Sequence, residues 1–385
     1  MDSALRVGFF TEIHRPVMNG VVASVEGLAR GLRSRGHEVY CFAPRMPGDD
    51  GRGDVFFRMP SLPLPTRTPY RLTLPVVGRR SVRSVIKRLH VVHVHSPFVT
   101  GWMGLRYARR YGMPIIYTYH TQLEAYAHYV PFDQGATRFA TERLTRTFGN
   151  SVDAVVVPTE SMQARLRALG VTSRITVVPS GIDIAFFGSG RRSNHVRAAL
   201  GAGTGDHLLL YVGRVAREKS IEILLRALAS ARDPALRLAI AGDGPARAEL
   251  EQAAAQLGLG DTVRFLGETP RDRLPQLYAS CDAFVFPSTS ETQGIVLAEA
   301  LAAGAYVIAA DAPQNREVLG GSGEIVPAAP ASFFAAFSRL GKPSEERATV
   351  ARAAAARFGI DEQIERTLAL YESLTRTYVR HRMVG

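Results

Sequence analysis

Several features that mark large classes of proteins are scarce or missing in this chain of 385 residues. It has only 2 cysteines, Cys41 and Cys281, at the edges of separate apolar runs, which excludes a disulfide scaffold and a cysteine metal site. The longest mostly apolar run, residues 300–310, is about half of the ~20 residues that a membrane-spanning helix needs. The first residues, MDSALRVGFF, lack a basic leader followed by an apolar core. We therefore expect a cytoplasmic protein with buried free thiols, no transmembrane helix and no export signal.

Two sequence signatures of other protein classes are also absent. No G-x-G-x-x-G follows the first apolar run, where VGFFTEIHRP stands instead, which argues against a nicotinamide-dependent oxidoreductase. The net charge of +12 would suit a nucleic-acid binder, but the chain lacks a recognisable RNA or DNA module, and its cations are not interleaved with aromatic residues. We expect neither function.

Positive charge is concentrated in the first half of the chain. Residues 1–188 hold 24 Arg and Lys against 13 Asp and Glu, whereas residues 189–385 hold 23 against 22. Only Lys87, Lys219 and Lys342 among the 47 cations are lysines. A lysine within a motif is therefore a stronger candidate for a specific role than it would be in a lysine-rich chain.

Short β-branched or aromatic runs alternate with amphipathic helices along the chain, a pattern that predicts parallel βαβ units. The runs of the first half are residues 6–10, 38–42, 91–95, 114–119, 153–158 and 175–179. After a Gly- and Ser-rich stretch, SGIDIAFFGSGRRSN, they resume at residues 208–213, 236–242, 262–267, 282–287 and 305–310. The first helix, predicted for residues 21–35, carries Val21, Val25, Leu28 and Leu32 on one face.

The length and the interrupted pattern predict two doubly wound, Rossmann-like α/β domains, residues 1–185 and 186–361, with that stretch as a linker. A final helix, residues 362–385, has an apolar stripe and is expected to pack back on the first domain. Ligands of such folds bind at the carboxyl ends of parallel strands, so we expect a site in a cleft between the two domains.

Two glycine-containing turns are expected to reach this site. The loop MNGV, with Asn19 and Gly20, precedes a helix whose N-terminus would offer N–H groups to an anion, although a glycine there is more often only a turn. The turn GRVAREK brings Arg214 and Lys219 together at a strand's carboxyl end, which suits a diphosphate. The plainer interpretation of this turn is a solvated loop in which Lys219 pairs with Glu222.

The stretch SETQGIVLAEALAAG carries two acids on an otherwise apolar segment. If a helix starts near Thr292, the N–H groups of Gln293, Gly294 and Ile295 are available to a ligand. Glu291 at the helix N-terminus would also be explained by the helix dipole, which is worth about 0.3–1 kcal/mol. Glu299 is harder to explain by structure alone, because burying an unpaired carboxylate is costly. We therefore favour a diol, such as a ribose, as its partner.

A fourth stretch, YTYHTQ, places polar and aromatic residues at the exit of a buried strand. Its histidine, His120, could be structural as readily as catalytic. Two further histidines stand in similar places, His95 at the end of VVHVH and His128 in AHY.

In order and spacing, these stretches resemble glycosyltransferase family 4, which comprises retaining enzymes of the GT-B fold. The turn GRVAREK, the pair Glu291 and Glu299, SGID at 180–183, GDGP at 242–245 and the NGVV loop fall where that family has its motifs. The first-half segments HVHSPFVTGWMGLRYARR and YTYHTQLEAYAHYVP are similar to segments of the diacylglycerol glucosyltransferases. The chain departs from the family in having serine before GID and no proline in its GAYV loop.

The resemblance implies a hexosyltransferase that uses a nucleotide sugar and retains the anomeric configuration. Glu291 would hold the hexose hydroxyls, Glu299 the ribose, and His120 would lie near the reacting sugar. Arg214 and Lys219 would neutralise the diphosphate. The other donor-binding residues would be Asn19, Gly20, Gly213, Asp243, Gly244, Gln293, Gly294, Ile295 and Val296. The acceptor-binding residues would be Tyr126, His128 and Tyr129.

We expect no metal site and no cofactor beyond the nucleotide-sugar co-substrate. Metal-dependent glycosyltransferases commonly use Asp-x-Asp, which occurs nowhere in this chain. The cations Arg214 and Lys219 can stabilise a departing diphosphate electrostatically in place of a divalent ion.

The basic first half indicates an anionic membrane surface and a lipid acceptor such as diacylglycerol. Residues 79–89 predict a helix with one apolar and one basic face, and Trp102 lies one turn from Arg106, Arg109 and Arg110. Such surfaces gain about 1 kcal/mol per cation near anionic headgroups. The same cations could instead be solvated while the apolar faces cover the sheet.

Several alternatives stay open at this stage. UDP with glucose is the favoured donor, and a GDP-mannose-dependent transferase with a glycolipid or soluble acceptor is the first alternative. A non-catalytic nucleotide-sugar binding protein is an alternative of another class. The sequence does not indicate an oligomeric state.

Overall fold

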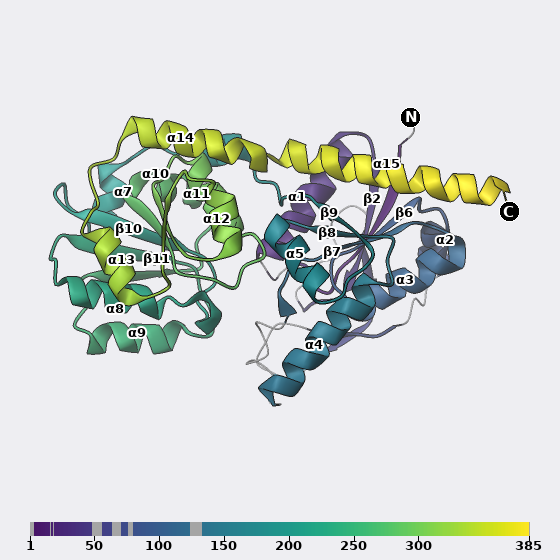
Figure 1. The fold of residues 1–385 in the computed structure, drawn as a ribbon, viewed down its shortest axis with the longest axis horizontal. Coiled ribbons are helices and arrows are strands. Elements are labelled where there is room, and N and C mark those ends of the chain that lie inside the picture. Colours follow the sequence, from purple (N-terminus) through teal and green to yellow (C-terminus); the bar gives the residue numbers. More distant parts are fainter. Residues whose placement is uncertain are drawn as a thin grey trace. The chain divides into compact units, whose positions relative to one another are not determined.

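The computed structural model describes residues 4–15, 17, 19–47, 56–63, 71–75, 80–123 and 133–384. The chain divides into two compact units, each described by itself below (Figure 1). Unit 1 comprises Met1–Gly181 and Ile360–Gly385, and unit 2 comprises Ile182–Gly359. Each unit holds one large parallel sheet with interleaved helices, so the predicted α/β fold class is confirmed.

Unit 1 has a seven-stranded sheet in the order β3-β2-β1-β6-β7-β8-β9, and every pair in it is parallel. The strands are β1 (Arg6–Phe10), β2 (Glu38–Pro44), β3 (Phe56–Met59), β6 (Val91–Val94), β7 (Ile115–Thr118), β8 (Ala154–Val157) and β9 (Arg174–Val177). The chain order reverses between β1 and β6, and in open parallel sheets such reversals are where ligands bind. A separate antiparallel pair joins β4 (Ser61–Pro63) and β5 (Arg71–Thr73).

Helices of unit 1 pack apolar side chains against this sheet. They are α1 (Gly20–Ser34), α2 (Arg80–Lys87), α3 (Val99–Tyr111), α4 (Gln134–Gly149), α5 (Glu160–Ala168) and α15 (Ile360–Val384). In α1 the predicted stripe is largely correct, since Val25, Leu28 and Leu32 are buried. The last helix, α15, packs on α1 and buries Ile364 and Tyr371 in the same cluster, so the end of the chain completes the core of unit 1.

Unit 2 has a six-stranded parallel sheet in the order β12-β11-β10-β13-β14-β15. The strands are β10 (His207–Val212), β11 (Leu236–Ala241), β12 (Val263–Gly267), β13 (Ala283–Phe286), β14 (Val307–Ala310) and β15 (Glu324–Val326). The order reverses between β10 and β13. The carboxyl ends of these two strands are therefore the expected place for a ligand in this unit.

Helices cover the two faces of this sheet in separate hydrophobic clusters. They are α6 (Ile184–Gly188), α7 (Asn194–Ala199), α8 (Glu222–Ala231), α9 (Arg247–Gln256), α10 (Leu274–Ser280), α11 (Ile295–Ala302), α12 (Pro313–Leu319), α13 (Pro330–Phe337) and α14 (Glu345–Ala355). One cluster contains Leu297 and Leu301 of α11, and the other contains Leu224 of α8 and Phe333 of α13.

The stretch predicted as a linker contains a short helix. It contains all of α6, and the side chain of Asp183 accepts a hydrogen bond from the Phe186 N–H at 2.8 Å. This cap and the burial of Phe187 stabilise a short helix that the local composition does not favour. Within the described ranges, no helix combines the length and apolarity needed to cross a bilayer.

Candidate active site

Three loops meet at the carboxyl ends of the central strands in unit 2. They follow β10, β11 and β13, and glycines allow the first two to lie against each other. A Cβ added to Gly242, whose φ is +139°, would lie 1.9 Å from the Gly213 carbonyl oxygen. One added to Gly244 would lie 2.3 Å from the Val215 carbonyl oxygen. The GDGP motif therefore has a packing role, whatever ligand the loops bind.

Lys219 and Glu291 form an ion pair between two of these loops. The Lys219 Nζ to Glu291 Oε1 distance is 2.5 Å, and the side chains are 9% and 23% exposed. The 3-10 turn Arg217–Lys219 places the lysine here. The alternative that pairs Lys219 with Glu222 is wrong, because Glu222 instead pairs with Arg226 on α8. Low exposure makes this pair electrostatically stronger than an ordinary surface pair.

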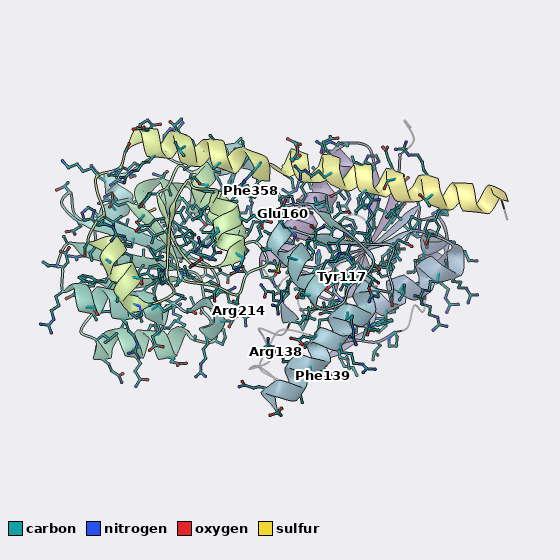
Figure 2. All side chains as sticks on the ribbon, in the orientation of Figure 1. Tyr117, Arg138, Phe139, Glu160, Arg214 and Phe358 are labelled. Atoms are coloured by element: carbon teal, nitrogen blue, oxygen red, sulfur yellow. The ribbon has the colours of Figure 1, made fainter. Side chains whose placement is uncertain are left out.

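Arg214 lies on the same loop, beside a buried acid that the sequence analysis missed. Its Nη1 is 3.6 Å from Oε1 of Glu218, whose side chain is only 3% exposed. Ser290 Oγ donates to the Glu218 carbonyl oxygen at 3.0 Å, which ties this loop to the one after β13. The spacing of four residues between Arg214 and Glu218 is the signal that could have revealed the pair. Arg214 itself is one-third exposed and is labelled in Figure 2.

Glu299 is buried in α11, as the sequence led us to expect, but it has partners. Tyr278 Oη donates to its Oε2 at 3.0 Å, and Arg271 Nη1 lies 4.0 Å from its Oε1. The Arg271 guanidinium also lies over the Phe187 ring, 5.1 Å from the centroid. Burial raises the pKa of Glu299 to about 7, while Arg271 and the Tyr278 hydrogen bond act in the opposite direction. Neither partner was predicted.

The helix after Glu291 begins later than predicted. Gly294, with φ of +77°, is the N-cap, and α11 starts at Ile295. The first-turn N–H groups therefore belong to Ile295 and Val296, while Gln293 precedes the helix and is buried. The helix starts late because the backbone at Gly294 is left-handed, a conformation that the helix-forming residues after it do not predict.

Two other predicted donor-binding side chains already have intramolecular partners. Asp243 Oδ2 accepts from Arg247 at 3.0 Å, and its Oδ1 accepts from the Gly244 N–H. In unit 1, Asn19 Oδ1 accepts from the Val22 N–H at 3.0 Å and so caps α1 directly before Gly20. Asn19 therefore has at least a capping role.

At the carboxyl ends of β6 and β7, unit 1 holds three histidines. His95 Nδ1 and His120 Nε2 are hydrogen-bonded at 3.0 Å. His93 is bonded to Thr118 Oγ1 and to Tyr371 Oη, both at 2.6 Å. Burial lowers the pKa of His120 to about 4 and that of His93 to about 3, and lowers the pKa of His95 well below its ordinary value. All three imidazoles are therefore neutral near neutral pH.

Glu12 is a second acid that the sequence analysis did not single out. It lies in VGFFTEIHRP, after β1, and accepts from the Thr100 N–H at 2.7 Å and from Thr73 Oγ1 at 2.5 Å. Burial raises its pKa. Its carboxylate accepts from an N–H group in the first turn of α3. The N-cap residue of this helix, Phe98, makes no side-chain capping hydrogen bond, so Glu12 takes that role. The predicted acceptor-binding residues Tyr126, His128 and Tyr129 lie outside the described residues.

Comparison with known proteins places this fold in a class. HepE from Anabaena, solved in complex with UDP-glucose, has a TM-score of 0.77 at 21% identity and covers 96% of this chain and 100% of its own. Sucrose-phosphate synthase from Thermosynechococcus elongatus has a TM-score of 0.71 at 21% identity, with 99% of each chain covered. The fold is that of the GT-B glycosyltransferases.

The family follows from the sequence comparisons. The model for Glycosyltransferase Family 4 matches residues 18–186, and that for Glycosyl transferases group 1 matches residues 193–357. Alpha-monoglucosyldiacylglycerol synthase of Acholeplasma laidlawii is 32% identical over 79% of this chain and 80% of its own. A GDP-mannose-dependent alpha-mannosyltransferase of Mycolicibacterium smegmatis is also 32% identical, over 82% of each chain. The chain belongs to glycosyltransferase family 4, as the resemblance predicted.

The buried Glu299 predicts a pH dependence of stability. Because the pKa of Glu299 is about 7 in the folded protein and 4.5 for an ordinary glutamate, the folded protein binds this proton more tightly than the unfolded chain does. Unfolding free energy is therefore lost as pH rises from about 4.5 to about 7, by an amount on the order of 3 kcal/mol. We expect Glu299→Gln to remove this loss, seen as a smaller drop in Tm between about pH 5 and about pH 8. Equal drops in both proteins would contradict the assignment.

Proposed function

We propose that the protein is a retaining hexosyltransferase that moves glucose from a UDP-linked donor to a lipid acceptor such as diacylglycerol. The observation that carries this proposal is the ion pair of Lys219 and Glu291 at the strand reversal of unit 2, with Arg214 on the same loop as the lysine. Relatives named as glucosyldiacylglycerol synthases support the sugar and the acceptor. The UDP-glucose complex of HepE supports the nucleotide.

In this proposal the two partners of the ion pair bind different parts of the donor, the diphosphate and the hexose. The Lys219 ammonium and the Arg214 guanidinium bind the diphosphate, and the Glu291 carboxylate accepts from the hexose hydroxyls. In the absence of donor, each charge compensates the other. Because Lys219 is already largely desolvated, its ammonium can stabilise the charge that develops on the departing diphosphate with little reorganisation. We propose that these cations serve in place of a divalent metal.

Glu299 is proposed to bind the ribose. A carboxylate can accept hydrogen bonds from both hydroxyls of a diol. Tyr278 Oη donates to Glu299 Oε2 and so helps to fix the orientation of the carboxylate. Gly213, Gly244 and the first N–H groups of α11, those of Ile295 and Val296, are proposed to line the same donor site. The N-terminus of a helix favours a negative ligand.

Unit 1 is proposed to bind the acceptor, with His120 contacting the transferred hexose and Gly20 the phosphates. The acceptor hydroxyl attacks the anomeric carbon from the face that the diphosphate leaves. The bond from that carbon to the phosphate oxygen breaks, the bond to the acceptor oxygen forms, and the acceptor proton passes to the phosphate. A neutral His120 would orient the sugar by hydrogen bonding, because its lowered pKa leaves it uncharged.

A GDP-mannose-dependent activity is the second candidate, because mannosyltransferases are as similar in identity as the glucosyltransferases. A thermal-shift panel of UDP- and GDP-sugars, followed by turnover of the best binder with diacylglycerol, decides between them. We expect UDP-glucose to raise Tm most and to be consumed, with full turnover in excess chelator. Glu291→Gln should lower kcat/KM by about 100-fold or more, since it removes a charged contact to the sugar.

Turnover of GDP-mannose instead would replace the glucosyl assignment. A protein that binds the nucleotide sugar but neither hydrolyses it nor transfers the sugar to any acceptor in a lipid extract would instead be a non-catalytic binding protein. Loss of turnover in chelator would overturn metal independence.

We further propose that unit 1 binds an anionic membrane surface, where a cytoplasmic enzyme would meet its lipid acceptor. The apolar face of α2 packs on the core, since Ile86 is buried and Val82 and Val85 are half-buried, and Arg83 and Lys87 are exposed. The exposed face of α3 is different, because it carries Trp102 together with Arg106, Arg109 and Arg110. Phe139 on α4 is also exposed, next to Arg138 (Figure 2). An aromatic side chain beside several cations suits the headgroup region.

Vesicle binding tests this surface. Replacing Arg106, Arg109 and Arg110 by glutamine should lower partition onto phosphatidylglycerol vesicles by about 100-fold, at about 1 kcal/mol per cation. Binding of the unmodified protein should also weaken as salt is added. The measurement is co-sedimentation at low salt, with phosphatidylcholine vesicles as the uncharged control. Recovery of the unmodified protein entirely free of anionic vesicles would contradict the proposal.

A further inference from the structure

A short helix of unit 2, α12, presents two buried amide side chains to the loop that carries Glu291. Asn315 is fully buried, and Gln314 is 2% exposed. Asn315 Nδ2 donates to the Ser288 carbonyl oxygen at 2.9 Å, and Gln314 Nε2 donates to the Thr289 carbonyl oxygen at 2.8 Å. Two successive carbonyls of the loop after β13 are therefore held by neighbouring residues of one helix.

The Asn315 amide also joins this loop to the next strand. Its Nδ2 makes a second hydrogen bond at 2.9 Å, to the carbonyl oxygen of Ala310 at the end of β14. Both N–H groups of the amide are thus used, and Asn315 Oδ1 is buried without a hydrogen-bond partner among the described residues. The reverse orientation would place Oδ1 against two carbonyl oxygens, so the amide is fixed by its two donors. An apolar side chain of the same size could not make either bond.

The helix that carries these amides is anchored independently of the loop. Its Val318 and Leu319 are buried in the same hydrophobic cluster as Leu297 of α11. Arg357 Nη2 donates to the Val318 carbonyl oxygen at 2.8 Å, and Gly320, with φ of +53°, caps the helix end. The two amides therefore reach the loop from a packed support.

The other half of the same loop is held by the loop after β10. Ser290 Oγ donates to the Glu218 carbonyl oxygen at 3.0 Å, and the next residue, Glu291, pairs with Lys219. Each of residues 288–291 thus has a contact to another element, two through amides of α12 and two through the loop after β10. Contacts on both sides restrict where the Glu291 carboxylate can lie, which is how supporting residues preorganise a binding group.

We infer that Asn315 and Gln314 are positioning residues, which hold residues 288–291 so that the Glu291 carboxylate faces Lys219. Neither amide needs to touch a ligand for this role. The importance for binding the hexose rests on the function proposed above, whereas the effect on the ion pair does not. Amides that only stabilised the fold would affect Tm and leave the ion pair as it is.

Lysine NMR reports on the ion pair without any ligand. The chain has only 3 lysines, so protein with carbon-13 lysine gives few side-chain signals, and Lys219→Met identifies that of Lys219 by its loss. Glu291→Gln shows where this signal lies once the carboxylate charge is gone. Gln314→Met and Asn315→Leu remove the amide donors with little change in volume. We expect both to move the Lys219 signal toward its position in Glu291→Gln.

Gln276→Met is the matched control. Gln276 also lies in unit 2, and its Nε2 donates to a backbone carbonyl oxygen, that of Arg191, at 2.7 Å. Its replacement should leave the Lys219 signal unchanged. An unchanged signal in both Gln314→Met and Asn315→Leu, with Tm values that show folded proteins, would overturn the inference. If Asn315→Leu does not fold, Gln314→Met still decides the question.

Calorimetric titration of UDP and of UDP-glucose gives the second readout, because only the sugar nucleotide offers a hexose to Glu291. In Gln314→Met and Asn315→Leu, Kd for UDP-glucose should rise by about 5-fold or more, while Kd for UDP stays within about 2-fold. Gln276→Met should change neither value. GDP-mannose and GDP replace these ligands if they bind more tightly.

An equal rise in Kd for both ligands would contradict the positioning of Glu291 and indicate general damage to unit 2. A different result would reject the proposed function alone. If Glu291→Gln leaves Kd for the sugar nucleotide unchanged while the Lys219 signal behaves as expected, the contact of Glu291 with the hexose is rejected, and the inference about Asn315 and Gln314 stands.

Discussion

The ion pair between Lys219 and Glu291 is the interaction on which this account of the donor site depends. Two opposite charges with little exposure attract each other more strongly than at a surface, and each would be costly to leave alone. The pair forms because glycines let the loops after β10 and β11 lie in contact and because Ser290 ties the loop after β13 to Glu218. A ligand that offers an anion and a set of hydroxyl donors can replace both partners at once.

The two units use one topology with contrasting chemistry. Each has a parallel sheet whose strand order reverses near its middle, with polar residues at the carboxyl ends of the central strands. Unit 2 places charged side chains there, paired and partly buried. Unit 1 places three neutral imidazoles there, linked through Tyr371 to a helix from the far end of the chain. The charged set suits a diphosphate, and the neutral set suits sugar or acceptor hydroxyls.

The sequence predicted much of this arrangement, because periodicity and turn residues are local signals. The strands, the first helix, the burial of Glu299 and the glycine-rich turns all follow from patterns within about twenty residues. Contacts between side chains from different strands and loops cannot be predicted in this way, because they depend on the order of the strands in the sheet. Lys219 pairs with Glu291, 72 positions away, rather than with its neighbour Glu222, and Tyr278 reaches Glu299 from another helix. Glu12 has no local signal either, because its partners Thr73 and Thr100 are 61 and 88 positions away.

The central claim is that Lys219 binds the nucleotide diphosphate and that Glu291 does not. Calorimetric titration of UDP, or of GDP where it binds more tightly, tests this directly. Lys219→Met should raise Kd by about 10-fold or more, since it removes a charge-assisted contact. Glu291→Gln should leave Kd unchanged or lower it, because it frees the ammonium group, and the double variant should bind as weakly as Lys219→Met. Equal affinity in all four proteins would contradict the account.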